Sequence, residues 1–211
     1  KRDGKFLLRL DDTDSNRSKK EFSDQIRVDL QWIGLNWDQE ISQSKHIDRY
    51  DCIKNSLIEL GRLYECFESP EELDLKRKKQ LNMCQPPVYD RAALRLSERE
   101  KDDLRSKKPS YWRFKLNDEV IRWNDLILGE QAINPSSVSD PVLIKADGQY
   151  LYTLASVVDD IDYAVTDVIR GLDHVTNTAV QIQIFEALSR PVPNFGHHSL
   201  LINHDGKALS K

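Results

Sequence analysis

The sequence predicts an α/β protein whose Rossmann-like sheet is interrupted by an inserted α+β segment. Near the N-terminus, a short apolar run at 5–10 indicates a buried strand, and apolar residues at helical spacing follow between 22 and 33. A strand followed so closely by a helix is the first half of a βαβ unit. The same order returns at 164–169 and 176–188, after a long mixed stretch. A mostly parallel sheet with an insertion accounts for this order.

Cap and turn residues support the elements at both ends of the chain. Ser18 and Glu21 have the spacing of a capping box, and Gly34 is placed to end the first helix. Thr176-Asn177 stands where the last helix should be capped. We therefore expect the first helix to begin near Ser18 and the last near Thr176.

The stretch between these ends divides into shorter elements. The patterns predict helices at 46–60, from 70 to a break at 84–87 and from 97, and strands at 112–116, 142–145 and 150–158. Alternation at 112–116 indicates a half-exposed strand. Asp147-Gly148 predicts a hairpin turn between the last two strands.

Composition excludes several classes of protein. Of 211 residues, 39% are apolar and 31% charged, which is typical of a soluble globular chain and not of a disordered one. No run of 18 apolar residues predicts a membrane span, and no apolar leader is visible. Cys52, Cys66 and Cys84 are an odd number without a CxxC pair, which favours a reducing cytoplasm over a disulfide framework. With no initiator Met and no terminating element, we expect a fragment of a longer protein.

The net charge of −4 argues against a generally basic nucleic-acid binder. We divide the chain into 1–63, 64–150 and 151–211, with net charges of 0, −1 and −3. Inside the middle block, the stretch 76–115 carries 13 basic and 5 acidic side chains, net +8, together with the aromatic residues Tyr89, Tyr111 and Trp112. This stretch is either a phosphate-binding footprint or a solvated helix face followed by a charged loop.

Acidic residues follow the first predicted strand, at the edge where α/β sheets bind ligands. Asp11, Asp12 and Asp14 are candidates for a ligand site, and equally for a turn and N-cap cluster. A calcium loop is excluded because Arg17 replaces the required Gly. A phosphatase using Asp12 and Asp14 is a remote alternative.

Other candidates have simpler structural explanations. Asp159-Asp160 closes a predicted strand and is more typical of a helix cap than of a metal site. His197 and His198, adjacent on a strand, would face opposite sides and share no metal. Cys66 is expected to be a small buried hydrophobic residue. Arg170, at a strand end, is a candidate for binding a carboxylate or for a surface ion pair.

Taken together, several segments resemble bacterial-type glutamyl-tRNA synthetases, a family of class I aminoacyl-tRNA synthetases, most closely their alphaproteobacterial branch. The matching blocks lie in order at 4–14, 30–38, 66–73, 139–142, 152–160, 168–178 and 208–211. The blocks around Asp11 and Arg170 are the most specific, and 208–211 is similar to the class I KMSKS loop. The resemblance covers essentially the whole chain.

The resemblance implies a class I catalytic domain that activates L-glutamate with ATP and Mg²⁺ and transfers it to tRNA(Glu), with tRNA(Gln) as a second candidate. It implies that Arg170 holds the glutamate side chain, with Asp11, Tyr152 and Ser156 around the amino acid. Asp173, His174, Leu201, Ser210 and Lys211 fall on ATP-side positions, and Lys211 is the expected catalytic lysine. The block 64–150 would bind the tRNA acceptor arm, with contacts expected from Lys76, Arg77, Lys78, Lys79 and Arg113.

Departures from the family narrow these expectations. Zinc-binding relatives carry Cys-x-Cys and Tyr-x-Cys, whereas this chain has Cys66-Phe67-Glu68 and Tyr89-Asp90-Arg91, so we expect no zinc and no other metal ligand set. The HIGH motif would lie upstream of Lys1 and the anticodon-binding region beyond Lys211. We therefore expect the 211 residues alone to be inactive, and the complete protein to be an active, cytoplasmic, membrane-free monomer. Two alternatives stay open: the paralogue that glutamylates tRNA(Asp), and an inactive tRNA-binding module.

Overall fold

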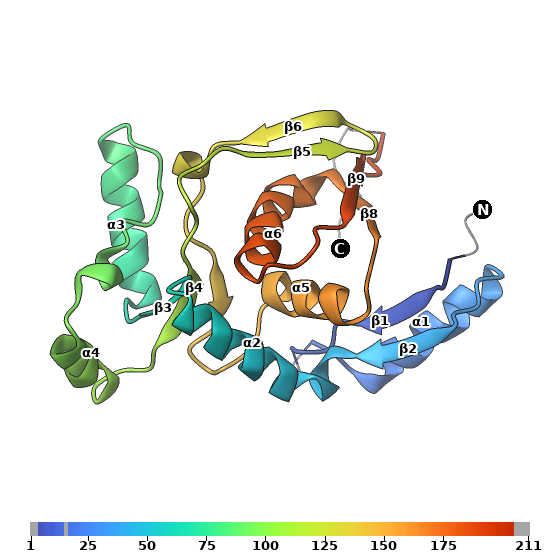
Figure 1. Ribbon diagram of the computed structural model, residues 1–211, viewed down its shortest axis with the longest axis horizontal. Coiled ribbons are helices and arrows are strands. Elements are labelled where there is room, and N and C mark those ends of the chain that lie inside the picture. The colour runs from blue at the N-terminus through green and yellow to red at the C-terminus, as the bar shows by residue number, and fades with distance from the viewer. Residues whose placement is uncertain (1–3, 15–16, 205–211) are drawn as a thin grey trace.

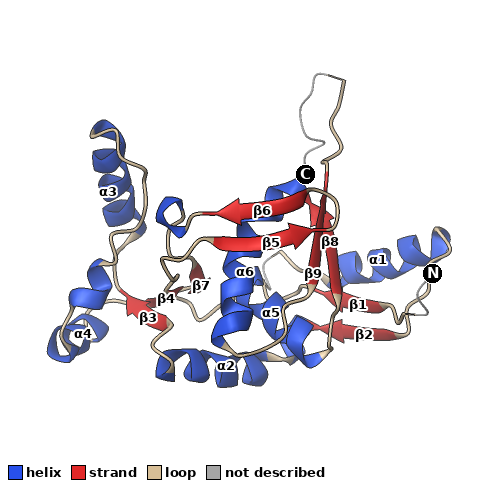
Figure 2. Ribbon diagram, turned by 45° about the horizontal axis from the view of Figure 1, so that its top comes forward, coloured by secondary structure: helices blue, strands red, loops and turns tan. Residues whose placement is uncertain are grey.

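The computed structural model describes residues 4–14 and 17–204. Its parallel strands form two separate pairs, and two antiparallel sheets lie between them in sequence (Figures 1 and 2). Within the described residues, no strand joins the two parallel pairs into the single Rossmann-like sheet that the sequence predicts. None of the helices in this part of the chain is long and apolar enough to cross a membrane.

The first parallel pair joins β1 (Leu7–Leu10) to β2 (Gln39–Ser42), with α1 (Lys20–Trp32) as the crossover. Gly34 has a φ of +79°, as expected for a residue that ends a helix. The predicted capping box is wrong, because Ser18 belongs to the preceding turn, where its N–H donates to Asp14 O. Lys19 takes the N-cap position and makes no side-chain cap bond.

The second helix, α2 (Ile47–Glu59), agrees with the prediction at 46–60. It buries Tyr50, Ile53 and Leu57 against α5 and α6, and Gly61 follows with a φ of +64°. This apolar face contributes directly to the main core, where Tyr50 and Leu57 are completely buried.

The middle of the chain builds a three-stranded antiparallel sheet in the order β3–β4–β7 (Leu63–Cys66, Tyr111–Phe114 and Val142–Ile144). The prediction of a half-exposed strand at 112–116 is wrong: β4 is the central strand, so three of its four residues are buried. Two helices, α3 (Pro70–Asn82) and α4 (Glu98–Arg105), lie at the end of the molecule far from β1 and β2 (Figure 1). Each begins with a complete capping box, led by Ser69 and Ser97.

A hairpin, β5 (Ile121–Asp125) and β6 (Gly129–Ile133), leaves this region and reaches across α6 to β9 (Figure 1). The sequence prediction missed it. Ile121 packs with Ile182 and Phe195, so the hairpin shares a small core with α6 and β9.

The predicted strand at 150–158 is wrong, because these residues lie mostly in α5 (Tyr152–Asp162). The hairpin at Asp147-Gly148 is limited to one bridge between Ile144 and Tyr150. A continuous apolar run is compatible with a buried strand or a buried helix, and here α2 and α6 cover it. Asp159 and Asp160 are consequently buried in a helix and neither end a strand nor cap a helix.

The second parallel pair joins β8 (Asp167–Gly171) to β9 (Asn194–His198) through α6 (Val175–Ala187). The strand predicted at 164–169 therefore begins and ends later than expected. Thr176-Asn177 does not cap α6, because a 3-10 turn at Leu172–His174 runs directly into the helix. Helices α5 and α6 fill the centre of the molecule between the strands (Figure 2).

Candidate functional site

A cavity of about 780 Å³ runs alongside β1 of the first parallel pair and β8 of the second. It is lined from β1 by Arg9 and from the following turn by Asp11; Tyr152 comes from α5 and Arg170 from β8. Three of the residues expected around glutamate, Asp11, Tyr152 and Arg170, therefore share one cavity. A parallel strand brings the polar residues at its carboxyl end to such a cavity, which explains why residues far apart in sequence meet here.

The guanidinium of Arg170 is held by uncharged groups. Its Nη1 donates to the Tyr152 hydroxyl at 3.1 Å, and its Nη2 donates to the Thr178 hydroxyl. Its Nε donates to Nε2 of His197 at 3.4 Å. Within 4–14 and 17–204, no carboxylate lies within ion-pair distance of Arg170; buried Asp160, which pairs with Arg9, acts on its charge only at longer range.

Arg9 lies on the same cavity but is surrounded by acids. It contacts Asp160 at 2.7 Å, Asp11 at 3.1 Å and Asp159 at 3.8 Å. Burial raises the pKa of Asp160, and the facing Arg9 charge only partly opposes this. The Asp11 side chain is 44% exposed, so its carboxylate is accessible at the edge of the cavity. This part of the cavity is suited to a cation.

The neighbouring acids do not assemble a metal or phosphatase site. Both oxygens of Asp12 accept hydrogen bonds from Ser44, and Asp14 pairs with Arg17. Among the residues that the structure describes, no group of three His, Cys, Asp or Glu side chains is placed to hold a metal ion. Asp12 thus fixes the loop after β1 to the 3-10 turn at Gln43–Lys45 that follows β2.

The remaining described residues that were predicted for the amino acid and ATP do not line this cavity. Ser156 lies one turn after Tyr152 on α5, and its buried hydroxyl has no hydrogen-bond partner among the described groups. Asp173 and His174 follow β8, and the rings of His174 and Tyr152 pack edge to face with their centres 5.6 Å apart. Leu201 is 77% exposed. Ser210 and Lys211 lie outside the described residues.

The predicted tRNA-binding side chains have different surroundings. Lys76 pairs with Glu68 at 3.1 Å and with Asp90 at 3.2 Å. Arg77 lies 3.8 Å from Asp74, whereas Lys78 and Lys79 are exposed on α3. All three are exposed, and among the described residues neither Lys78 nor Lys79 forms an ion pair.

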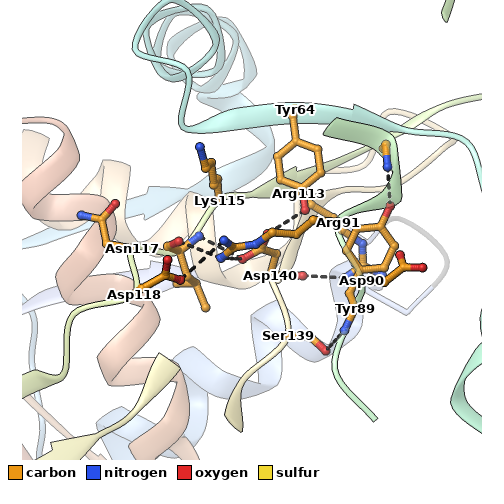
Figure 3. A network of polar contacts seen from close by, with 12 residues as sticks. Tyr64, Tyr89, Asp90, Arg91, Arg113, Lys115, Asn117, Asp118, Ser139 and Asp140 are labelled. Carbon is orange, nitrogen blue, oxygen red and sulfur yellow. Dashed lines mark hydrogen bonds and ion pairs between the residues drawn. The ribbon is translucent and has the colours of Figure 1, made fainter. Parts of the chain in front are cut away.

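Arg113 differs from the other basic residues because its side chain is buried. Its guanidinium lies 4.2 Å from the Tyr89 ring centre and donates to the backbone carbonyl of Asp140 (Figure 3). A buried cation in contact with an aromatic ring supports the fold, so we leave Arg113 out of the proposed tRNA contacts.

The positions compared with zinc-binding relatives form a hydrogen-bonded cluster. The Tyr89 hydroxyl lies 3.6 Å from Cys66 Sγ and donates to Glu68 at 2.9 Å. Burial raises the pKa of the Cys66 thiol to about 12, which disfavours the thiolate that binds metal. The expectation of no zinc stays a prediction that these contacts support.

Sequence reasoning missed the residues behind Arg170. Asp125, Thr178 and His197 are all buried, and none was predicted for the site. His197 does face inward while His198 is exposed, as alternation on β9 predicts. No local pattern could have paired Asp125 with His197, because the two are 72 residues apart.

Comparison with known proteins covers the whole chain. A family described as "tRNA synthetases class I (E and Q), catalytic domain" matches residues 1–211. The chain is 61% identical over 208 residues to Glutamate–tRNA ligase 2 of Cereibacter sphaeroides, covering 99% of this chain and 47% of that protein. It is 61% identical over 209 residues to Glutamate–tRNA ligase 1 of Roseobacter denitrificans, with the same coverage. The chain thus spans about half the length of the curated relatives it matches.

Solved structures give the same result. A glutamate tRNA ligase from Elizabethkingia meningosepticum, in complex with its amino acid, superimposes with a TM-score of 0.87 at 31% identity, covering 97% of this chain and 45% of the other. The glutamate-tRNA synthetase from Elizabethkingia anophelis gives a TM-score of 0.88 at 32% identity, over 98% of this chain and 46% of the other.

Proposed function

Because this chain belongs to the family of class I tRNA synthetase catalytic domains for glutamate and glutamine, we propose that its protein attaches glutamate to tRNA. In the first step, a glutamate α-carboxylate oxygen attacks the α-phosphorus of ATP, and pyrophosphate leaves. In the second, a hydroxyl at the 3′ end of tRNA attacks the glutamyl carbonyl, and AMP leaves. The names of the relatives, glutamate–tRNA ligases at 61% identity, support this reaction.

The observation that carries the proposal is the charge of Arg170. Its guanidinium faces a cavity, its partners are neutral, and no described carboxylate lies within ion-pair distance of it. A planar cation in this setting is suited to a side-chain carboxylate, which it binds through two parallel hydrogen bonds. Arg170 is therefore proposed to select glutamate by its γ-carboxylate.

The opposite charge at Asp11 complements this role. Its partly exposed carboxylate is proposed to face the α-ammonium group of glutamate. Tyr152, which already contacts Arg170, is proposed to line the pocket, and the unpartnered Ser156 hydroxyl is proposed as a further polar contact. A cavity with a cation at one place and an anion at another fits a zwitterionic amino acid with a charged side chain.

ATP is proposed to bind beside the turn that follows β8, near Asp173 and His174, with Leu201, Ser210 and Lys211 contributing from the C-terminal end of the chain. Transfer at phosphorus develops negative charge that a positioned cation stabilises. Lys211 is proposed to supply that cation. Mg²⁺ is proposed to accompany ATP, and no step is assigned to it here because no described cluster of ligands identifies its site.

The middle block, 64–150, is proposed to hold the tRNA acceptor arm between catalytic parts 1–63 and 151–211. Exposed Lys78 and Lys79 on α3 support a phosphate contact, because α3 projects from one end of the molecule (Figure 1). The β5–β6 hairpin of this block packs on β9, which would connect the block to the cavity. We further propose that the protein acts in the cytoplasm as a monomer.

Attachment of labelled glutamate tests the reaction. The complete gene product is incubated with ATP and purified tRNA(Glu), tRNA(Gln) or tRNA(Asp). We expect tRNA(Glu) to be charged, and charging of tRNA(Gln) would extend its range. Charging of tRNA(Asp) alone would transfer the assignment to the paralogue, and no charging by folded protein would leave a tRNA-binding module.

Arg170 gives the residue-level test. Arg170→Ala should raise the KM for glutamate by about 30-fold or more, since truncating one member of a buried charge pair costs about 2–5 kcal/mol. Arg170→Lys should recover little, because an ammonium cannot form the paired hydrogen bonds. Arg190→Ala, at an exposed arginine just after α6, serves as the control. An unchanged glutamate KM in Arg170→Ala would remove Arg170 from the site.

A further inference from the structure

A buried chain of hydrogen bonds leads from the β5–β6 hairpin to Arg170. Asp125 ends β5, His197 lies on β9, and Thr178 lies on α6. The Asp125 carboxylate contacts Nδ1 of His197, and Nε2 of the same ring lies 2.8 Å from the Thr178 hydroxyl and 3.4 Å from Arg170 Nε. His197 and Thr178 are fully buried, and Asp125 is 2% exposed.

The surroundings of Asp125 fix the role of each carboxylate oxygen. Oδ1 accepts backbone N–H groups from Ile127, Leu128 and His197, each at 3.0 Å. Oδ2 faces the His197 ring and accepts a longer hydrogen bond, at 3.5 Å, from Nε1 of Trp123. Burial works against a charged Asp125, but the hydrogen bonds from the His197 ring and these N–H groups outweigh it and lower the pKa of Asp125 below its usual range. Asp125 is therefore an ionised carboxylate, which can only accept hydrogen bonds.

An accepting carboxylate determines which ring nitrogen of His197 carries the proton. Nδ1 must donate to Asp125, so the neutral ring presents the lone pair of Nε2 to Arg170, while the single hydroxyl hydrogen of Thr178 is shared between Nε2 and the His174 carbonyl at 3.2 Å. The opposite tautomer would turn an N–H toward the Arg170 Nε–H. Asp125 thus determines whether Nε2 of His197 can accept a hydrogen bond from Arg170 Nε.

The same contacts leave Arg170 with a defined pair of free donors. A guanidinium has five N–H groups. Three are used by Tyr152, Thr178 and His197, one from each nitrogen. One N–H is left on each terminal nitrogen, which is the pair that a carboxylate accepts.

We propose that Asp125 and His197 are positioning residues that orient Arg170 for the glutamate side chain by fixing the His197 tautomer. The inference rests on the proposed binding of glutamate at Arg170. Asp125 comes from the block proposed to hold tRNA, so a residue of that block would set the geometry of the amino-acid pocket.

Asp125→Asn tests the inference in the complete gene product. Three backbone N–H groups will keep the amide oxygen at the Oδ1 position, so the NH₂ group must face His197 Nδ1 and force the proton onto Nε2. Loss of the correct tautomer disables a histidine without moving it. We expect the glutamate KM to rise about 10- to 100-fold, the range seen for residues that orient a ligand-binding group. The KM for ATP should stay within about twofold.

Two further measurements separate positioning from general structural support. Nitrogen-15 NMR of the histidine rings should show the Nδ1–H form in the wild type and the Nε2–H form in Asp125→Asn. In a His197→Gln background, which has no tautomer, Asp125→Asn should add little to the glutamate KM. Glu130→Gln, an exposed acid on the same hairpin, is the charge-matched control and should change nothing.

The outcomes are distinguishable. Normal glutamate KM in Asp125→Asn, with charging lost in Arg170→Ala, would overturn the positioning role alone. An equal rise in the KM values for glutamate and ATP, or an unchanged tautomer, would overturn it as well. No charging by the wild type would overturn the proposed function and this inference together.

Discussion

Replacing Asp140 by Asn should destabilise the protein by about 3 kcal/mol or more. Its buried carboxylate accepts from the Tyr64 hydroxyl at 2.7 Å, from Arg91 Nε and Nη2 at 2.8 and 2.9 Å, and from Leu116 N at 3.0 Å (Figure 3). Two donors converge on each oxygen, so an Asn side chain must turn its NH₂ group toward two of them. Each buried donor left without an acceptor costs about 1–3 kcal/mol, and breaking a buried ion pair costs about 3–5 kcal/mol. Arg91 is 31% exposed and regains some hydration, which places the estimate at the low end.

Equilibrium unfolding in urea, followed by tryptophan fluorescence, measures this loss. With a typical dependence on urea of about 1–3 kcal/mol per molar, the midpoint should fall by about 1–3 M. Asp118→Asn is the matched control: Asp118 also faces Arg91, at 3.6 Å, but its side chain is 93% exposed and its pair should contribute almost nothing. A loss below about 1 kcal/mol in Asp140→Asn, or equal losses in both variants, would refute the reasoning.

Three more outcomes are expected. Alkylation of native protein at pH 8, mapped by mass spectrometry, should modify exposed Cys52 and Cys84 but spare Cys66, whose pKa burial raises to about 12; early labelling of Cys66 would contradict this. Burial favours neutral Glu68, but hydrogen bonds from its own N–H, Tyr89 and Lys76 outweigh burial and lower its pKa below the usual 4.5. The ionised carboxylate therefore stabilises the fold above that pH, and this contribution is lost as the pH falls. Glu68→Gln should lose less stability on acidification than the wild type, and an unchanged dependence of unfolding free energy on pH would count against this. Changing Lys78 and Lys79 together to Gln should weaken tRNA binding and lower its salt dependence, whereas the same change at exposed Lys19 and Lys20, at the opposite end of the molecule, should not; equal effects would place α3 off the interface.

Local signals in the sequence predicted the parts of the fold that local chemistry determines. The helix starts predicted at 70 and 97 and the helix end predicted at Gly34 depend on neighbouring residues only, and the structure places helix ends there. The capping box predicted at Ser18 is the exception, because Ser18 lies in the turn before α1. The stretch 150–158 is strand-like in sequence and includes Val157 and Val158, which favour strands in isolation. These residues instead lie mostly in α5, which packs against α2 (Ile47–Glu59) and α6 (Val175–Ala187), and that packing has no local pattern in the sequence.

The candidate site was likewise predictable only in part. A resemblance to known sequences identified Arg170, Tyr152 and Asp11, and the structure places all three on one cavity. Arg113 and Lys76 were expected to contact tRNA because they lie in a basic stretch of the block that the resemblance assigns to the acceptor arm, but in the fold both have internal partners. Composition reports how many charges a stretch carries, whereas only the fold decides which of them are free to meet a ligand.

The two arginines of the cavity show how partners determine function. Arg9 faces three aspartates, so it stabilises the fold and has no surplus charge for a substrate carboxylate. Arg170 is held in place by hydroxyl groups and a neutral ring, which fix its orientation and leave its charge intact. A glutamine amide at the same place would bring no negative charge and would aim an NH₂ group at one of the two free N–H donors. If Arg170 binds the substrate side chain as proposed, the neutral groups behind it provide a physical basis for choosing glutamate over glutamine, since a specific site penalises an unpaired buried polar group most.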